Sequence, residues 1–484
     1  MTDLKTKPRP ELGLLSRALM VLICLLFFTV VGGIAIERYW RFGQPLGLDN
    51  AYFFQRVWQS VFLDEPQRTL LNTEVGQGLI AGRHFEPILI LMRPIVALFP
   101  KMESLLLAQV AIIAAGGYGA FSLAHRFVAD RITAIMLGTV WLLMPGLWTL
   151  GVQDFRTLAL AAPLVVIAHA ALVRGKPLGA AVFTLLALSC REEVLLLFAA
   201  SLPAMWLCAK GQRREVLISA LCCLLWWGVI FVGHEHSGGF ISPDELAAGA
   251  KEAFVGGILV PDGVWGRMVG ALGGGVGAGI IAPLTLLPLL LNGVGVVATG
   301  ELSDANSVRL LSVAFGAMGL VVAVGFGALR FLSERMISGH KPIWLLRVVA
   351  LALMLWNGFK VGSLFQGDIV LVSQVVRGEV NPVDFRQGPW ELLLSAPLNQ
   401  PILTEEAFAP MLVARPELYV SDDWRGDEAF EIVQLHVNVA LFSPDHQWVD
   451  RLLDVGFVVT RDAGRAVLLE RTAPAPALPP VIPL

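Results

Sequence analysis

The apolar run LLSRALMVLICLLFFTVVGGIAI, from Leu14 to Ile36, decides the fold class. A membrane-spanning helix needs about 20 apolar residues, so this run is long enough to cross a bilayer. It is too long for the core of a signal peptide, and no clean cleavage site follows it. Lys5, Lys7, Arg9 and Arg17 lie before it or in its first turn. The positive-inside rule therefore places the N-terminus in the cytoplasm.

The remainder of the chain is equally apolar over most of its length. Of its 484 residues, 56% are hydrophobic and only 15% are charged, whereas about 25% are charged in a typical soluble domain. This composition excludes a disordered chain, a soluble enzyme and a nucleic-acid binder. The further apolar runs are 104–124, 132–150, 157–173, 177–190, 194–209, 215–233, 268–299, 309–330 and 343–360.

Basic residues between the runs predict the direction of each pass. The segments rich in Lys and Arg are 125–131, 174–176, 210–214 and 330–341. All four should face the cytoplasm. The fourth basic segment, 330–341, faces the cytoplasm only if 268–299 crosses the membrane twice, as a tight hairpin near Pro283 and Pro288. If 268–299 crosses once, the C-terminal tail would be cytoplasmic. We favour the hairpin, which predicts about eleven transmembrane helices and an external tail.

The net charge of −3 is a cancellation between two different parts of the chain. Residues 1–360 hold 28 Lys and Arg against 22 Asp and Glu, a net charge of +6. Residues 361–484 hold 8 Arg against 17 Asp and Glu, a net charge of −9. We therefore predict a polytopic α-helical membrane domain over 1–360, followed by an acidic soluble domain.

The soluble domain is predicted over 361–471 as a small α/β domain that faces the periplasm. Alternating apolar residues indicate short strands between helical stretches, and 456–471 is typical of a β-hairpin. The proline-rich end, 472–484, is expected to be disordered. The five cysteines lie in or beside apolar runs without metal-ligand spacing, so neither a disulfide framework nor a zinc site is predicted. The chain also lacks a phosphate-binding P-loop motif.

Two polar groups lie in the long first outer loop, 37–103. Asp49 opens a stretch with apolar residues at helical spacing, typical of an amphipathic helix at the membrane interface. It is either the cap of that helix or a base or metal-binding carboxylate. Arg83, His84 and Glu86 precede a short apolar segment. They are either a solvated loop or a phosphate clamp with an acid/base group, with Glu86 and Asp49 as candidate metal ligands.

Two further polar groups interrupt apolar runs on the same predicted face. Asp154 and Arg156 lie between runs only a few residues apart, and Arg191 and Glu192 break a longer apolar stretch. Charges so close to hydrocarbon are costly. Asp154 and Arg156 either pair with each other or cap a helix, or they face a partner or a water-filled cavity. Arg191 and Glu192 either mark the outer corner between two short helices or face a polar cavity. A desolvated glutamate in such a cavity would have a raised pKa and could handle protons.

The blocks that carry these residues resemble a family of predicted bacterial membrane proteins of unknown function. They are GLDNAYFFQRVW (47–58), RHFEPILILMRPIVALFP (83–100), QDFRTLALAAPLV (153–165) and CREEVLLLFAA (190–200). In that family they resemble FDLGIFDQ, GDHFSPIL, FDFHPLAL and a KEDLAL-type corner. The chain departs from this pattern at Arg156, where the family has His, and at Arg191, where it has Lys. It also has LDN at 48–50, where the family often has a second acid nearby.

The family is similar in layout to the GT-C class of membrane glycosyltransferases. This resemblance implies a sugar transferred from a polyprenyl-phosphate donor at the outer face of a bacterial inner membrane. Asp49, His84 and Asp154 match positions of the family's pattern. Together with the residue patterns above, this gives Asp49, Asp154 and Glu192 as candidate catalytic residues. The candidate phosphate ligands are Arg83, His84, Arg156 and Arg191, and a divalent cation, Mg²⁺ or Mn²⁺, is a candidate cofactor. The alternatives are a non-catalytic membrane scaffold with a GT-C-type body and a lipid or solute transporter.

Overall fold

The computed structural model describes residues 13–41, 48–63, 85–128, 130–192, 194–237, 343–381, 389–396, 400–405, 408–412, 414, 418–421, 437–464 and 466–472. Backbone contacts group the chain into two compact units. Unit 1 comprises residues 1–32, 109–151 and 157–369, and unit 2 comprises 33–108, 152–156 and 370–484. The segment 37–103, which follows the first apolar run, therefore belongs to the same unit as the tail of the chain.

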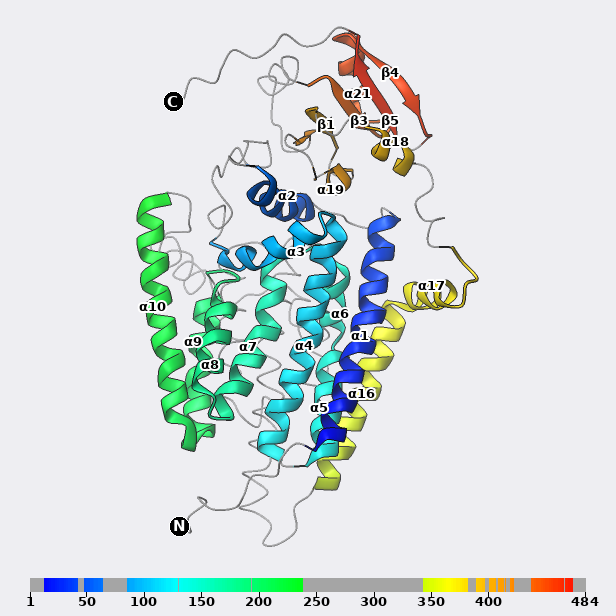
Figure 1. The fold of residues 1–484 in the computed structure, drawn as a ribbon. Coiled ribbons are helices and arrows are strands. Elements are labelled where there is room, and N and C mark those ends of the chain that lie inside the picture. Colours follow the sequence, from blue (N-terminus) through cyan, green and yellow to red (C-terminus); the bar gives the residue numbers. More distant parts are fainter. Residues whose placement is uncertain are drawn as a thin grey trace, which may run out of the picture. The chain divides into compact units, whose positions relative to one another are not determined.

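The predicted apolar runs that fall on described residues form helices (Figure 1). These helices are α1 (Leu14–Trp40), α4 (Met102–Val128), α5 (Arg131–Leu142), α6 (Pro145–Val152), α7 (Thr157–Val173), α8 (Pro177–Leu188), α9 (Val194–Cys208), α10 (Arg213–Ser237) and α16 (Ile343–Leu364). A 3-10 turn, η3 (Lys210–Gln212), precedes α10. The described part of the chain is thus mostly helical, as expected for a polytopic membrane protein.

Four described helices are long and apolar enough to cross a membrane, namely α1, α4, most of α10 and most of α16. A fifth candidate is the pair α5 and α6, which is bent by 50°. The run predicted over 132–150 is therefore formed by two helices with a bend between them, and it remains a candidate for one pass. Proline lacks an N–H group and restricts the residue before it, which explains why the first helix ends just ahead of Pro145. The predicted runs 268–299 and 309–330 lie outside the described residues, so the total of eleven passes stays a prediction.

Close packing in unit 1 depends on small residues of α4. A Cβ atom added to Gly116 would clash with Trp141 of α5 and would lie 2.6 Å from the Pro163 Cβ of α7. A Cβ atom added to Gly117 would lie 2.6 Å from Leu142. Membrane helices often approach one another at such small residues, because lipid supplies no hydrophobic force between them.

Several helical elements of unit 2 lie in the segment 37–103. Helix α2 (Leu48–Phe62) packs on the 3-10 helix η2 (Pro87–Met92), on α3 (Arg93–Leu98) and on the short helix α19 (Ala409–Leu412). The end of α1 also contacts α19, since the Tyr39 hydroxyl donates to the Pro410 carbonyl at 3.3 Å. After α16, the chain forms α17 (Gln366–Val376) and α18 (Pro389–Ser395).

The tail of the chain forms a five-stranded sheet in the order β2-β1-β3-β5-β4. Its strands are β1 (Ile402–Thr404), β2 (Leu418–Val420), β3 (Val439–Phe442), β4 (Phe457–Asp462) and β5 (Val467–Arg471). The first three run parallel, whereas β5 is antiparallel to both β3 and β4. The hairpin predicted over 456–471 is thus formed by β4 and β5, and an irregularity between Val459 and Arg461 interrupts its register.

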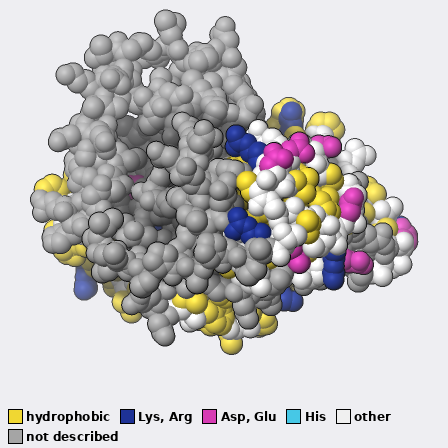
Figure 2. Space-filling view, turned by 90° about the horizontal axis from the view of Figure 1, so that it is seen from above, with side chains coloured by type: hydrophobic (Ala, Val, Ile, Leu, Met, Phe, Trp, Pro, Cys, Tyr) yellow, Lys and Arg dark blue, Asp and Glu magenta, His cyan; other side chains and the backbone are white. Residues whose placement is uncertain are grey.

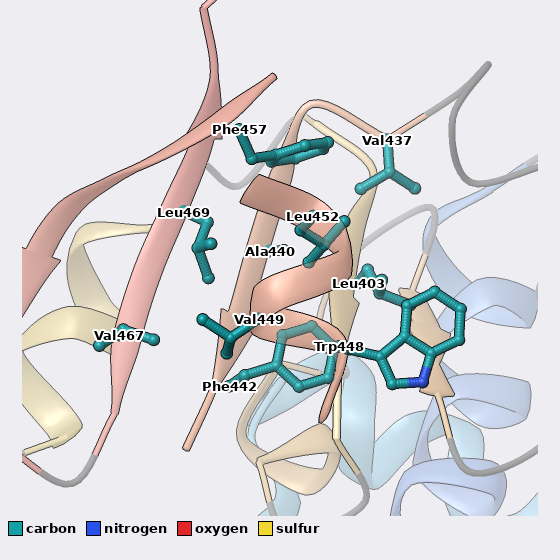
Figure 3. Close-up of a cluster of buried hydrophobic side chains, with 10 residues drawn as sticks. All are labelled: Leu403, Val437, Ala440, Phe442, Trp448, Val449, Leu452, Phe457, Val467 and Leu469. Atoms are coloured by element: carbon teal, nitrogen blue, oxygen red, sulfur yellow. The ribbon is translucent and has the colours of Figure 1, made fainter. Parts of the chain in front are cut away.

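Helix α21 (Gln447–Asp454) covers one face of the sheet (Figure 3). Trp448, Val449 and Leu452 of this helix pack onto strand residues such as Phe442 and Leu469. Apolar residues three and four apart on a helix share one face, which explains why this short helix can bury three of them. In the face shown in Figure 2, the described surface mixes Asp and Glu with hydrophobic, Lys and Arg side chains.

Candidate functional site

Asp154 is a buried carboxylate held by helix α2. It lies in the short segment between α6 and α7, and it is 7% exposed. The Asn50 side-chain N–H donates to its Oδ1 atom at 2.8 Å. The Asn50 carbonyl oxygen accepts a bond of 2.6 Å from the Phe155 backbone N–H. One amide side chain therefore fixes both the carboxylate and the backbone next to it.

Aromatic packing adds to this connection between α2 and the 152–156 segment. The rings of Phe53 and Phe155 meet edge to face, with 5.6 Å between their centroids. Phe155 is fully buried, and Phe53 is 8% exposed. Such edge-to-face pairs stabilise a fold by more than the burial of their apolar surface alone. The position of Asp154 relative to α2 is thus set by two hydrogen bonds and one aromatic contact.

A buried ion pair joins α2 to the start of η2. Arg56 donates from Nη1 to the Glu86 Oε2 atom at 2.8 Å, and both side chains are at most 4% exposed. The Arg56 guanidinium also lies 4.9 Å from the centroid of the Tyr52 ring, within the range of a cation–π interaction. Charges can be buried in this way only when they are paired. The pair fixes Glu86 against α2.

Helix α2 is formed as predicted, but its polar residues are not exposed to water. Asn50, Gln55, Arg56 and Gln59 are each 5% exposed or less, as are the apolar Ala51, Phe54 and Val57. These side chains are buried because polar groups from distant segments, such as Glu86 and Asp154, bond to the side of α2 that the periodic pattern leaves for water. The predicted position of α2 at the membrane interface stays a prediction.

The predicted site residues divide between the two units. Asp154 and Arg156 belong to unit 2, as does the backbone of Asp49, which lies in the first turn of α2 beside Asn50. Arg191 and Glu192 belong to unit 1, where they follow α8, and Arg191 is 8% exposed. The side chain of Asp49 and the residues Arg83 and His84 lie outside the described residues.

The described residues do not form a metal centre. Among them, no group of three His, Cys, Asp or Glu side chains is arranged to hold an ion. Glu86, a candidate ligand, instead accepts a hydrogen bond from Arg56. Its carboxylate therefore fits an ion pair better than a cation site, because a divalent ion would have to compete with a buried guanidinium. The predicted role of Asp49 toward a metal stays a prediction.

Asn50 and Arg56 are the two residues of this site that the sequence analysis missed. Both lie within residues 47–58, but the local pattern gives neither a role. The sequence does hold a sign that they are buried, because both share helix α2 with many large apolar residues. An amide and a guanidinium on such a helix need buried partners. Those partners, Asp154 and Glu86, lie far away in the sequence.

Comparison with known proteins places the chain among membrane proteins. Residues 44–234 match the family described as predicted membrane protein (DUF2079). No curated protein matches the chain. The crystal structure of ArnT from Cupriavidus metallidurans bound to undecaprenyl phosphate is similar, with a TM-score of 0.52 and 13% identity. That similarity covers 95% of this chain and 99% of the ArnT chain.

The structure of the same ArnT in the apo state is also similar, with a TM-score of 0.46 and 13% identity. It covers 93% of this chain and 97% of the ArnT chain. The first ArnT similarity extends over nearly the whole chain, beyond the segment matched by the family. The predicted resemblance is confirmed: residues 44–234 match a family of predicted membrane proteins, and the chain has an ArnT-like, GT-C-like fold.

Proposed function

We propose that the protein is a GT-C-like membrane glycosyltransferase that moves a sugar from a polyprenyl-phosphate donor to an acceptor at the periplasmic face. The observation that carries the proposal is the buried Asp154 carboxylate, which Asn50 holds beside the first turn of α2, where Asp49 lies. The ArnT-like fold supports the general kind of activity. Undecaprenyl phosphate, named for the ArnT structure, belongs to the lipid class of the proposed donor.

The proposed reaction needs two kinds of group. A carboxylate takes the proton from the acceptor hydroxyl as the new glycosidic bond forms, and Asp154 or Asp49 is proposed for this role. Cationic groups stabilise the phosphate that leaves with the lipid as the old bond breaks. Arg83, His84 and Arg156 are proposed to bind that phosphate, together with Arg191.

Two further parts of the proposal, like the roles of Arg83 and His84, rest on the sequence alone. Glu192 is proposed as a further acid/base group, and a divalent cation, Mg²⁺ or Mn²⁺, as a cofactor that would neutralise phosphate charge. Glu86, one of the two candidate ligands of this cation, is paired with Arg56. Treatment with a chelator, followed by addition of each ion, measures whether transfer depends on it.

The test is a transfer assay with the purified full-length protein and radiolabelled polyprenyl-phosphate sugars. Asp154→Asn keeps the size of the side chain but removes the base, so we expect transfer to fall by about 100-fold or more. Asp49→Asn is assayed in parallel. Glu379→Gln is the matched control, because Glu379 lies in an exposed ion pair with Arg377 and should keep wild-type transfer.

The outcomes separate the proposal from its alternatives. If both Asp variants transferred sugar as fast as the wild type, Asp154 and Asp49 would have no role in the mechanism. Absence of transfer by the wild type with every donor would favour a non-catalytic scaffold. Thermal unfolding of Asp154→Asn checks that lost transfer does not reflect a lost fold.

A further inference from the structure

The parallel strands of the tail sheet end in a cluster of polar residues. In open α/β sheets, ligands bind outside the carboxyl ends of the strands, where the strand order reverses. Here β1 lies between β2 and β3, and the chain leaves β1 toward β2 on one side before it forms β3 on the other. The reversal therefore lies at the carboxyl ends of β1 and β3. The residues that follow the three parallel strands are Glu405, Ser421 and Ser443.

Hydrogen bonds join this cluster to the start of α21. The Ser443 hydroxyl donates to the Glu405 Oε1 atom at 2.5 Å. His446 caps α21, because its Nδ1 atom accepts a bond of 3.3 Å from the Trp448 N–H. A neutral imidazole that accepts at Nδ1 carries its proton on Nε2. That Nε2 atom lies 3.9 Å from the second oxygen of Glu405, which is too far for a direct hydrogen bond.

Ser421 gives an independent sign that a ligand is missing. The register pairs Thr404 with Val420, so Glu405 and Ser421 are the next residues on neighbouring parallel strands. Ser421 is 3% exposed, and its hydroxyl has no hydrogen-bond partner among the described residues. A buried hydroxyl without a partner is costly and calls for an explanation. Ser443 and the His446 side chain remain partly accessible, so the cluster is open to solvent on one side.

The charges around the gap between His446 and Glu405 define the chemistry of the missing group. The Glu405 carboxylate repels an anion, whereas the His446 N–H and the amino end of α21 disfavour a cation. A hydroxyl oxygen about 2.8 Å from both atoms could accept from Nε2–H and donate to the carboxylate. A ligand with several neighbouring hydroxyls would also reach Ser421. We propose that this cluster binds a carbohydrate.

The test is saturation-transfer NMR with the full-length protein in detergent and three free sugars: glucose, galactose and N-acetylglucosamine. We expect saturation transfer to at least one of them. Glu405→Gln and Ser421→Ala should each weaken binding by about tenfold, which is the effect of losing one hydrogen bond to a charged group or two neutral ones. Glu391→Gln is the matched control, because Glu391 is exposed on α18 and should bind like the wild type.

Stability separates a ligand role from a structural one. Removing a buried hydroxyl without a partner should leave the thermal midpoint of Ser421→Ala unchanged or raise it, while binding falls. Three results would overturn the proposal: no saturation transfer to any of the sugars, equal binding by the wild type and both variants, or binding of trialanine amide in place of the sugars. The sugar-binding experiment tests Glu405 and Ser421, whereas the transfer assay tests Asp154 and Asp49, so the two can fail separately.

Discussion

Arg56 and Glu86 form a buried ion pair. Neither the hydrophobic pattern nor their spacing in the sequence predicts this pair. They are 30 residues apart and meet at 2.8 Å, with almost no exposed surface on either side chain. In this setting a single charge left without its partner is far more costly than the absence of both. The pair therefore fixes how α2 meets η2 whether or not it also contributes to the net stability.

Breaking this pair at one end should destabilise the protein strongly. Arg56→Met leaves the Glu86 carboxylate buried without its guanidinium, and we expect a loss of about 3–5 kcal/mol. The double variant Arg56→Met/Glu86→Leu should recover most of that loss. Urea unfolding in mild detergent measures these two variants and the single variant Glu86→Leu. If the double variant were as unstable as the sum of the two singles, the two side chains would not be coupled.

Asp130 is a second residue whose charge stabilises local structure. It caps α5 by accepting from the Thr133 N–H at 2.9 Å, and it pairs with Arg347 of α16 at 3.0 Å. Burial acts to raise the pKa of Asp130. The hydrogen bonds from Arg347 and Thr133 outweigh this effect and hold the pKa below the ordinary value of 3.8. The charged form is thus the form that stabilises the fold.

The sign of this shift sets a pH dependence. A carboxyl group with a lowered pKa contributes stability above its ordinary pKa and loses it as the pH falls through the lowered value. We therefore expect wild type to be more stable than Asp130→Asn at pH 7, with a difference that shrinks below about pH 4. Thermal unfolding from pH 3 to pH 7 measures this. A constant difference across the range would contradict the assignment.

At the scale of elements, helix α4 approaches its neighbours through glycine. Gly116 faces Trp141 and Pro163 so closely that a methyl group has no room. Gly228, in α10, has no neighbouring heavy atom within 4 Å of an added Cβ. The two glycines therefore offer a matched pair of sites on apolar helices, one packed and one open.

Alanine at these two positions should act in opposite directions. Gly116→Ala forces α5 and α7 away from α4, and we expect a loss of about 1–3 kcal/mol from overpacking. Gly228→Ala should be neutral or slightly stabilising, because alanine favours helix over glycine. The thermal midpoint of each purified variant checks this. A stable Gly116→Ala protein would mean that α4 can shift without cost.

The positions of the helices could be predicted because each is a continuous apolar run. The runs 157–173 and 343–360 lie within one or a few residues of α7 and α16. The break before Pro145 was missed although proline signals it, because hydropathy alone continues through that residue. The buried polar side of α2 could not be predicted, since Asp154 and Glu86 reach it from distant segments.

The whole molecule carries a predicted orientation that a reporter can test. With an inside N-terminus and two crossings by 268–299, the tail sheet faces the periplasm. Alkaline phosphatase fused after Thr472 should then be active, and a green fluorescent protein fusion at the same place should not fluoresce. The reverse pattern would indicate a single crossing by 268–299 and a cytoplasmic tail.

The irregular hairpin formed by β4 and β5 has a consequence for crowded membranes. Strand β4 is the last in the sheet, and Val458 and Val459 are each 43% exposed. An open edge of this kind can pair with the edge of a neighbouring copy and start aggregation. The register irregularity between Val459 and Arg461 and the charges of Arg461 and Asp462 hinder pairing of this edge with another strand. Molecules that are confined to two dimensions can therefore collide often without pairing through this edge of the sheet.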